Sequence, residues 1–183
     1  MAADQKQLQL KAGEDRVKDL RRKLNTAANN REYQVLKDQV AVQQAQTNFD
    51  KIAWRIEEGD LRGTCYIAQM VTEIKGLNYV GYHGMGGGGA ILGVDGLNRV
   101  GLKIPNYADT SGNPTAAKVY RAVKVIFSQP GIEGYMLGGF MYANQEQWHH
   151  AHGIVKALKE ELKDRTGFPV LLLIAGNKQR ETH

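Results

Sequence analysis

The chain has 183 residues, 42% of them hydrophobic, which is enough for one full domain with an appendage or for two small domains. Its net charge is +5, but acidic and basic residues are interspersed and no basic cluster alternates with aromatic residues, which excludes the usual pattern of a nucleic-acid partner. One cysteine, Cys65, excludes an internal disulfide and a Cys-x-x-Cys zinc site, and a polar N-terminus with only short apolar runs predicts a cytoplasmic protein without a membrane partner.

The first 58 residues have the composition of helices. They contain no proline and only one glycine, Gly13, and are rich in Gln, Ala, Lys, Asp and Arg. A polar segment, residues 25–30, interrupts them with residues typical of caps and turns. On both sides of it apolar residues recur at intervals of seven: Leu10, Val17 and Leu24, then Val35, Val42, Phe49 and Ile56.

Intervals of seven predict a coiled-coil seam, and two helices joined by a short polar loop predict an antiparallel helical hairpin over residues 1–58. Gly13 and Asp38 interrupt the seam, so we expect the hairpin to pack further on itself, on the second half of the chain or on another copy. Self-association through the hairpin is therefore one expected partnership. Residues 59–76 are predicted to be a connector, within which residues 60–75 fit either a helical face or an edge strand.

From residue 77 onward glycine becomes frequent and short apolar runs alternate with amphipathic ones. Strands are predicted at 78–82, 105–110, 134–140 and 169–175, and helices at 90–100, 115–129 and 148–164. The last strand has no polar alternation, which predicts burial on both faces, as in parallel sheets covered by helices. Four strands separated by three helices predict an α/β, doubly wound parallel sheet over residues 77–183, preceded by the helical hairpin.

One loop of this second half indicates a chemistry. The run Tyr79-Val-Gly-Tyr-His-Gly-Met-Gly-Gly-Gly-Gly-Ala-Ile-Leu-Gly-Val-Asp95 passes from a predicted strand, through glycines at 84 and 86–89, into a predicted helix. Such a turn collects bare N–H groups at a helix N-terminus, where an anion, most often phosphate, is held without a charged side chain. The alternative is a tight turn that only lets helix and sheet approach closely.

A series of short motifs carries a family resemblance over residues 77–182. In order, they are Leu77-Asn-Tyr-Val80, the glycine loop, Pro105-Asn-Tyr-Ala-Asp109, Thr115-Ala-Ala-Lys-Val119, Ile126-Phe-Ser-Gln-Pro130, Gly153-Ile-Val-Lys-Ala157 and Gly176-Asn177. The series resembles the C-terminal domain of the β subunit of succinyl-CoA synthetase, within the NDP-forming acyl-CoA synthetase and ATP-citrate lyase superfamily. The resemblance implies a flavodoxin-like fold, packing against an α-type subunit, and a glycine-led helix aimed at that partner's phosphorylated histidine.

The same resemblance implies the candidate site. The residues that match the family's phosphate-facing helix start are Gly86, Gly87, Gly88, Gly89 and Ala90. Secondary candidates are Gly112 and Asn113, in a loop where the family has a run of glycines, and His83, which lies beside the glycine loop. No catalytic residue and no metal ligand are assigned, because no base to activate a nucleophile is evident.

Departures from the family lie in loops that follow the strands. Residues 109–115 keep only Gly112 of the family's three glycines, residues 137–144 lack its arginine, and Ala175 stands where glutamate is usual. The family's cofactors are ATP or GTP with magnesium, and CoA. We expect none of them in this chain, because residues 1–76 are too short for the family's ATP-grasp domain. The chain also ends where the family continues with a helix and a strand. We therefore expect a C-terminally truncated module, inactive alone, that supports phosphoryl transfer and acyl-CoA formation with a partner subunit.

The hairpin has a second, shorter resemblance. Residues 4–50, particularly Asn29-Asn-Arg-Glu-Tyr-Gln-Val-Leu-Lys37, are similar to the coiled-coil part of bacterial C4-type zinc-ribbon proteins, without their cysteines. Two halves of unrelated origin leave an alternative open: a structural or assembly protein, or an engineered chimera, whose hairpin drives oligomerisation with the α/β domain as a passenger. The three histidines at 149, 150 and 152 favour a polar first turn of a helix over a metal site, although His149 and His152 are spaced to share a ligand.

Overall fold

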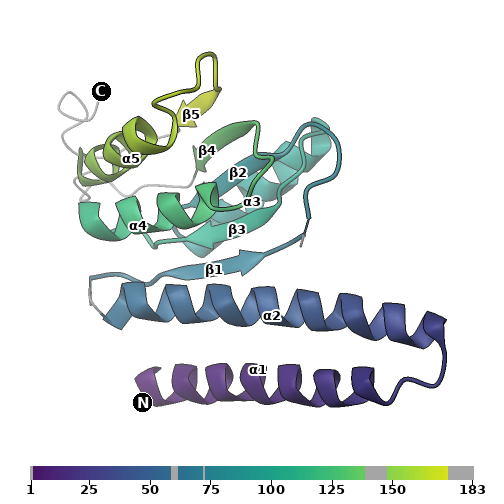
Figure 1. Ribbon diagram of the computed structural model, residues 1–183. Coiled ribbons are helices and arrows are strands. Elements are labelled where there is room, and N and C mark those ends of the chain that lie inside the picture. Colours follow the sequence, from purple (N-terminus) through teal and green to yellow (C-terminus); the bar gives the residue numbers. More distant parts are fainter. Residues whose placement is uncertain (1, 59–61, 72, 139–147, 173–183) are drawn as a thin grey trace.

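The protein consists of a long helical hairpin and a mixed five-stranded sheet covered by helices (Figure 1). The structure, a computed structural model, describes residues 2–58, 62–71, 73–138 and 148–172. The elements in chain order are α1 (Ala2–Asn25), α2 (Asn30–Glu58), β1 (Tyr66–Gln69), β2 (Val80–Gly84), α3 (Gly87–Arg99), β3 (Asn106–Asp109), α4 (Ala116–Phe127), β4 (Gly134–Gly138), α5 (Trp148–Glu161) and β5 (Val170–Leu172).

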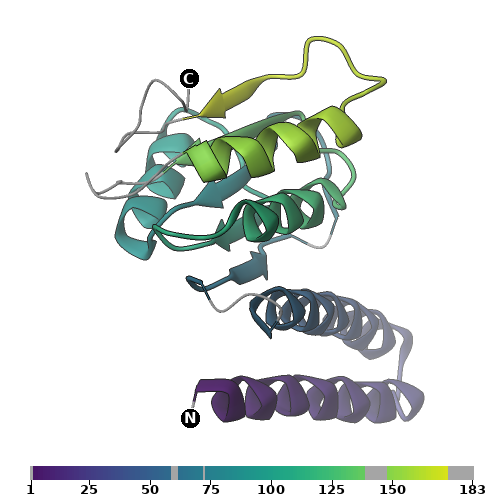
Figure 2. The same ribbon diagram turned by 90° about the vertical axis from the view of Figure 1, so that its left-hand side faces the viewer.

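The sheet has the strand order β1-β3-β2-β4-β5. Strands β3, β2, β4 and β5 run parallel, and only β1, at one edge, is antiparallel to its neighbour β3. Helix α3 covers one face of the sheet, while α4 and α5 cover the other (Figure 2). The predicted fold class, an α/β doubly wound sheet preceded by an antiparallel helical hairpin, is confirmed.

The two ends of the sheet show where the sequence pattern was ambiguous or misleading. The connector residues that fit either a helix or an edge strand form the edge strand β1. The prediction that the last strand is buried on both faces is wrong for its described part, since Val170 and Leu171 are 38% and 51% exposed. The reason is that, among the described strands, β5 is the opposite edge of the sheet and pairs with β4 alone. Residues 139–140 and 173–175 of the predicted strands lie outside the described residues.

Side chains that alternate along the central strand supply two separate cores. Tyr82 lies on the α3 side, in a cluster with Ala90, Leu97, Ile104 and Met136. The larger cluster, on the other side, joins the sheet to α4, α5 and the end of α2, through residues that include Ile56, Ile67, Val123, Tyr135, Leu137 and Ile154. Burial on both sides explains the apolar character of β2 and β4, every residue of which is buried except Val80.

Helix α2 begins at a capping box. The Asn29 side chain accepts a hydrogen bond from the Glu32 amide at 2.9 Å, and the Glu32 carboxylate accepts one from the Ala28 amide at 2.9 Å. This reciprocal pair of hydrogen bonds ends the polar segment between the helices and fixes where α2 begins. Leu10 and Val17 of α1 are buried in the hairpin, as the intervals of seven predicted for α1.

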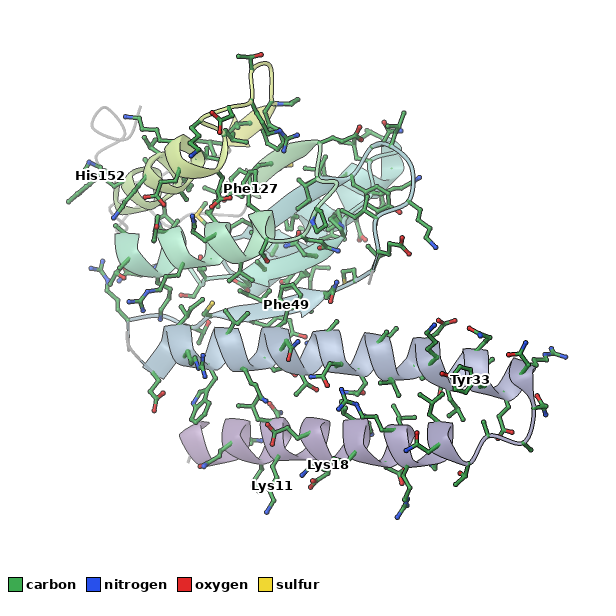
Figure 3. The ribbon with its side chains drawn as sticks, in the orientation of Figure 1. Lys11, Lys18, Tyr33, Phe49, Phe127 and His152 are labelled. Carbon is green, nitrogen blue, oxygen red and sulfur yellow. The ribbon has the colours of Figure 1, made fainter. Side chains whose placement is uncertain are left out.

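The row of sevens in α2 does not act as one seam against α1. Phe49 and Ile56 pack on the core of the α/β domain, and Figure 3 shows Phe49 between α2 and β1. Val35 and Val42, earlier in the same row, are 50% and 53% exposed. In a straight helix, residues spaced by seven shift around the helix axis by about 20° per heptad. Apolar residues at this spacing therefore face one neighbouring element at one end of α2 and another at the other end.

Helix α2 covers the edge strand β1, and the segment between them holds the hairpin against the sheet (Figure 1). The Gln69 amide of β1 donates to Oε1 of Gln46 at 3.3 Å, which occupies part of the unpaired edge. The buried ammonium group of Lys118 donates to the carbonyls of Arg62 and Gly63 at 2.8 and 2.7 Å. Although α1 and α2 are long, no helix in the described part of the chain is apolar enough along its length to cross a membrane.

Helices α4 and α5 cross closely at Gly153, which generates a stability prediction. A Cβ atom added there would overlap the carbonyl oxygen of Ala116 and lie 2.9 Å from Cβ of Val119. We therefore expect Gly153→Ala to lower the free energy of unfolding by about 1–3 kcal/mol, the usual cost of overpacking. The measurement is urea unfolding followed by circular dichroism.

The matched control for this variant is Gly96→Ala in α3. Gly96 is exposed, and an added Cβ meets no atom within 4 Å. Alanine is the better helix former, so this control should raise the free energy of unfolding by about 0.5–1 kcal/mol. Equal effects of the two substitutions would contradict the close α4–α5 crossing.

Candidate functional site

The glycine loop lies at the carboxyl edge of the sheet, where β2, β3 and β4 end side by side at Gly84, Asp109 and Gly138. A Cβ atom added to Gly84 would overlap Cβ of Ala90 and lie 3.1 Å from the carbonyl oxygen of Ala108. Glycine at this position therefore lets the first turn of α3 rest directly on the strand. The loop is at the edge where open α/β sheets place their ligands.

The turn into α3 requires a second glycine for its backbone conformation. Gly86 is the N-cap residue and has a φ of 89°, in the region that side chains other than glycine rarely adopt. The Ala90 amide donates to the Gly86 carbonyl at 3.0 Å, which is the first hydrogen bond of the helix. The glycines of the predicted site therefore form the start of α3, as the strand–loop–helix pattern indicated.

The first turn of α3 presents amides that the helix itself does not use. In any α-helix the leading N–H groups have no intrahelical acceptor, which here concerns Gly87, Gly88 and Gly89. The N-cap glycine provides no side-chain cap, and Gly87 and Gly88 are exposed. These amides and the positive end of the helix dipole form an environment suited to an anion.

Asp109 already places one negative charge beside this helix start. Its Oδ1 accepts hydrogen bonds from the Gly86 amide at 3.0 Å and the Ser111 amide at 2.8 Å. A carboxylate near a helix N-terminus is stabilising, but it also repels a second anion at the same end. The prediction from the sequence missed Asp109 as a site residue, although a polar residue that directly follows a buried strand at the carboxyl edge was the available signal.

The secondary candidates Gly112 and Asn113 lie in the loop between β3 and α4, which Asp109 ties to the glycine loop through Ser111. Asn113 is exposed, and its Oδ1 accepts a hydrogen bond from Nε of Arg62 at 3.1 Å. The Thr64 amide also donates to Oγ of Ser111 at 3.3 Å. The loop is therefore in contact with the segment that follows the hairpin, and its part in ligand binding stays a prediction.

His83 is fully buried and faces the opposite side of the sheet from α3. Its Nδ1 lies 2.8 Å from Oη of Tyr135 and its Nε2 lies 2.7 Å from Oγ1 of Thr110. Burial, and secondarily the nearby His150, lowers the pKa of His83 to about 3, so the ring is neutral near pH 7. Both ring nitrogens are engaged within the fold, and contact of His83 with an anion stays a prediction.

Tyr82 lies beneath α3 and explains a further glycine. A Cβ atom added to Gly93 would overlap the Tyr82 hydroxyl, so glycine makes room for the ring under the helix. The hydroxyl is buried and has no hydrogen-bond partner among the described residues, and burial, followed by the charges of Tyr107 and Asp109, raises its pKa to about 12. Tyr82 therefore stays protonated at the underside of the site.

The histidines at 150 and 152 belong to the first turns of α5, and His150 lies near enough to His83 to lower the pKa of that ring. His150 is buried, and the His152 ring makes an edge contact with Trp148, with 5.5 Å between ring centroids (Figure 3). The side chain of His149 lies outside the described residues. Within the described residues, no three His, Cys, Asp or Glu side chains gather in a way that could hold a metal ion.

The chain is similar in sequence to β subunits of succinate–CoA ligases. It is 33% identical over 105 residues to the GDP-forming enzyme of Thermus thermophilus, and 32% and 31% identical over the same length to the ADP-forming enzymes of Deinococcus radiodurans and Deinococcus deserti. The chain is partially homologous to these β subunits. The matches cover 56% of this chain but 26%, 25% and 26% of the relatives, so it spans about a quarter of their length. No protein-family model matches the chain.

Solved structures of ATP citrate lyase share the fold. The enzyme of Methanothrix soehngenii, solved with citrate and coenzyme A, superposes with a TM-score of 0.58 at 19% identity, over 72% of this chain and 36% of that one. The enzyme of Methanosaeta concilii, solved with (3S)-citryl-CoA, gives a TM-score of 0.57 at the same identity. At this level of identity the likeness shows the architecture alone. The resemblance of the second half to the CoA-ligase superfamily is confirmed, while that of the hairpin to zinc-ribbon proteins stays a prediction.

The buried His83 generates a pH prediction. Its pKa is about 3 in the fold and about 6.5 in an unfolded chain, so only the unfolded state binds this proton at intermediate pH. The contribution of His83 to the free energy of unfolding is fully present above pH 6.5. It falls by about 1.4 kcal/mol per pH unit as the pH is lowered from there towards 3. In urea unfolding at several pH values, His83→Gln should remove a slope of that size.

A measurement on the unaltered chain provides the control. The NMR resonances of the His83 ring should not titrate between pH 7 and pH 4, since the pKa of this ring is lowered to about 3 in the fold. Titration of His83 with a pKa near 6.5 would show that the ring is not sealed in the core.

Proposed function

We propose that this chain is a CoA-ligase β-subunit-like module that offers the N-terminus of α3 to a phosphoryl group carried by an α-type partner subunit. The observation that carries the proposal is the open first turn of α3, with the amides of Gly87, Gly88 and Gly89 at the carboxyl edge of the sheet. The partial homology to succinate–CoA ligase β subunits supports the same assignment. The module assists phosphoryl transfer and acyl-CoA formation, and it is inactive without its partner.

The geometry supports a supporting role in catalysis. Amides fixed at a helix start hold a phosphoryl group without reorganising, and their partial positive charge favours its negative oxygens. Gly88 is exposed with no atom near its Cβ position, so a group on another protein can approach the backbone directly. Asp109 accepts a hydrogen bond from the Gly86 amide, and its negative charge lowers the affinity of the helix start for any anion.

The family's cofactors, a nucleotide with magnesium and CoA, are not assigned to the described residues in this proposal. Magnesium is held by carboxylates together with substrate phosphates, and the described residues bring no three ligating side chains together. We therefore assign those cofactors to the partner or to another polypeptide of the complex. This chain supplies backbone amides, an adjacent carboxylate and a surface for docking.

Replacement of Gly88 tests the site. Gly88→Val should keep the fold, since the added side chain meets no atom of the chain, but it should block approach to the first turn of α3. We expect the affinity for inorganic phosphate to fall about tenfold or more, because the helix-start amides are the binding groups. The measurement is the shift of the amide NMR signals of residues 87–90 during a phosphate titration.

Two further variants sharpen this titration. Gly96→Val makes the same change on the same helix, away from its start, and should leave phosphate affinity unchanged. Asp109→Asn keeps the oxygen that accepts the Gly86 amide but removes the charge, so phosphate should bind more tightly, by about threefold to tenfold. Loss of affinity in Asp109→Asn, or equal affinity in Gly88→Val and Gly96→Val, would contradict the proposal.

The hairpin supports a second candidate function, assembly with another copy of the chain. Val35 and Val42 of α2 are half exposed and line, with Leu20 of α1, a shallow groove of about 520 Å³. The groove is also lined by Arg16 and Asp38, opposite charges of the kind that a self-complementary two-fold interface requires. The observation that favours this candidate is that Val35 and Val42 are exposed, although they belong to the same series on α2 as Phe49 and Ile56, which pack on the α/β domain.

Light scattering tests this assembly. The double variant Val35→Glu with Val42→Glu places four carboxylates at the paired grooves and should convert an oligomer to a monomer at the same concentration. Val155→Glu, at a 45% exposed position on α5, is the matched control and should not change the mass. A monomeric unaltered chain at high concentration would exclude assembly, and Gly88→Val should leave the mass unchanged under either function.

A further inference from the structure

A cleft lies where the hairpin meets the edge strand β1, and none of the residues that line it belongs to the glycine loop. It lies between α1, α2 and β1, has a volume of about 370 Å³, and is lined by residues that include Leu10, Gln46, Asp50, Trp54 and Tyr66. Its position depends on the packing of α2 along β1. It is therefore a feature of the junction between the two halves of the chain.

The cleft contains a carboxylate whose orientation is fixed by the sheet. The Gln69 amide of β1 donates to Oε1 of Gln46 at 3.3 Å, and Nε2 of Gln46 donates to Oδ1 of Asp50 at 2.7 Å. The side-chain amide of Gln46 is thus held by the backbone of β1 at one end and holds Asp50 at the other. A ligand would meet a carboxylate that is already in position.

This carboxylate has no counter-charge within the described part of the chain. Gln46 is its only hydrogen-bond partner there, and the adjacent Lys51 is engaged by Glu14, with 2.7 Å between Nζ and the carboxylate oxygen. Asp50 is half-buried, and this burial raises its pKa. A half-buried charge without a partner is unfavourable for folding, which a bound cation would relieve.

The walls of the cleft suit the apolar part of an organic cation. Trp54 and Tyr66 provide aromatic surface, and Leu10 and Ala53, both buried, provide aliphatic surface. Aromatic faces attract ammonium groups, and small-molecule sites typically combine apolar walls with one or two placed polar groups. A cavity of about 150 Å³ holds a benzene molecule, so this cleft has room for an aromatic ring with a short amine chain.

We propose that the cleft between the hairpin and β1 binds a small organic ammonium ion, with Asp50 as its counter-charge and Trp54 and Tyr66 against its apolar body. The site is independent of the phosphoryl-binding role proposed for α3, and failure of one leaves the other standing. Its affinity depends on the charge of the ligand, because Asp50 is the one carboxylate among the residues that line the cleft.

The test compares 2-phenylethylammonium with the neutral 2-phenylethanol, which has nearly the same shape, on the full chain at pH 7. We expect the ammonium ion to bind saturably in isothermal calorimetry and the alcohol to bind at least about tenfold more weakly. Asp50→Asn should lower the affinity for the ammonium ion about tenfold or more and leave that for the alcohol unchanged. Asp95→Asn, at an exposed position on α3 outside the cleft, should have no effect.

Thermal unfolding separates a binding role from a purely structural one. Without ligand, Asp50→Asn should melt at a higher temperature than the unaltered chain, because it removes a half-buried charge, so the variant is expected to fold. The ammonium ion should raise the melting temperature of the unaltered chain but not that of Asp50→Asn. Equal binding of the ammonium ion to both proteins, or no binding to either, would overturn the proposal.

Discussion

The contact between Gly84 and Ala90 determines what lies at the carboxyl edge of the sheet. Because neither residue has a side chain beyond Cβ, the first turn of α3 rests on the end of the central strand. The amides of this turn therefore open at the same edge as Asp109 and Gly138, where β3 and β4 end. A larger residue at Gly84 would lift the helix from the strand and separate these groups.

The carboxyl edge of the sheet contains both the amides at the start of α3 and the carboxylate of Asp109. Asp109 neutralises part of the positive end of α3 through the Gly86 amide, so the site combines attraction and repulsion for any anion. The chain spans about a quarter of the length of the succinate–CoA ligase β subunits that it matches.

The hairpin is joined to the sheet through polar and apolar contacts together. Phe49 and Ile56 enter the core of the α/β domain, while Gln46 occupies the edge of β1 and Lys118 holds the segment after α2. At this junction Gln46, which accepts a hydrogen bond from the Gln69 amide of β1, also donates one to Asp50. The outer part of α2 extends beyond this junction and leaves its apolar row uncovered (Figure 1).

The sequence by itself determined the helical hairpin, the alternation of strands and helices, and the glycine-led start of α3, because periodicity, capping residues and glycine act over a few neighbouring residues. Only the tertiary structure decided that Tyr66–Gln69 form an edge strand and that Val170 and Leu171 are exposed at the other edge. It also decided that Asp109 accepts the Gly86 amide and that Asp50 is held by Gln46. These outcomes depend on which strand becomes a neighbour of which and on the direction in which a row of sevens turns. Both are set by packing between segments that are distant in the sequence, so local sequence patterns do not predict them.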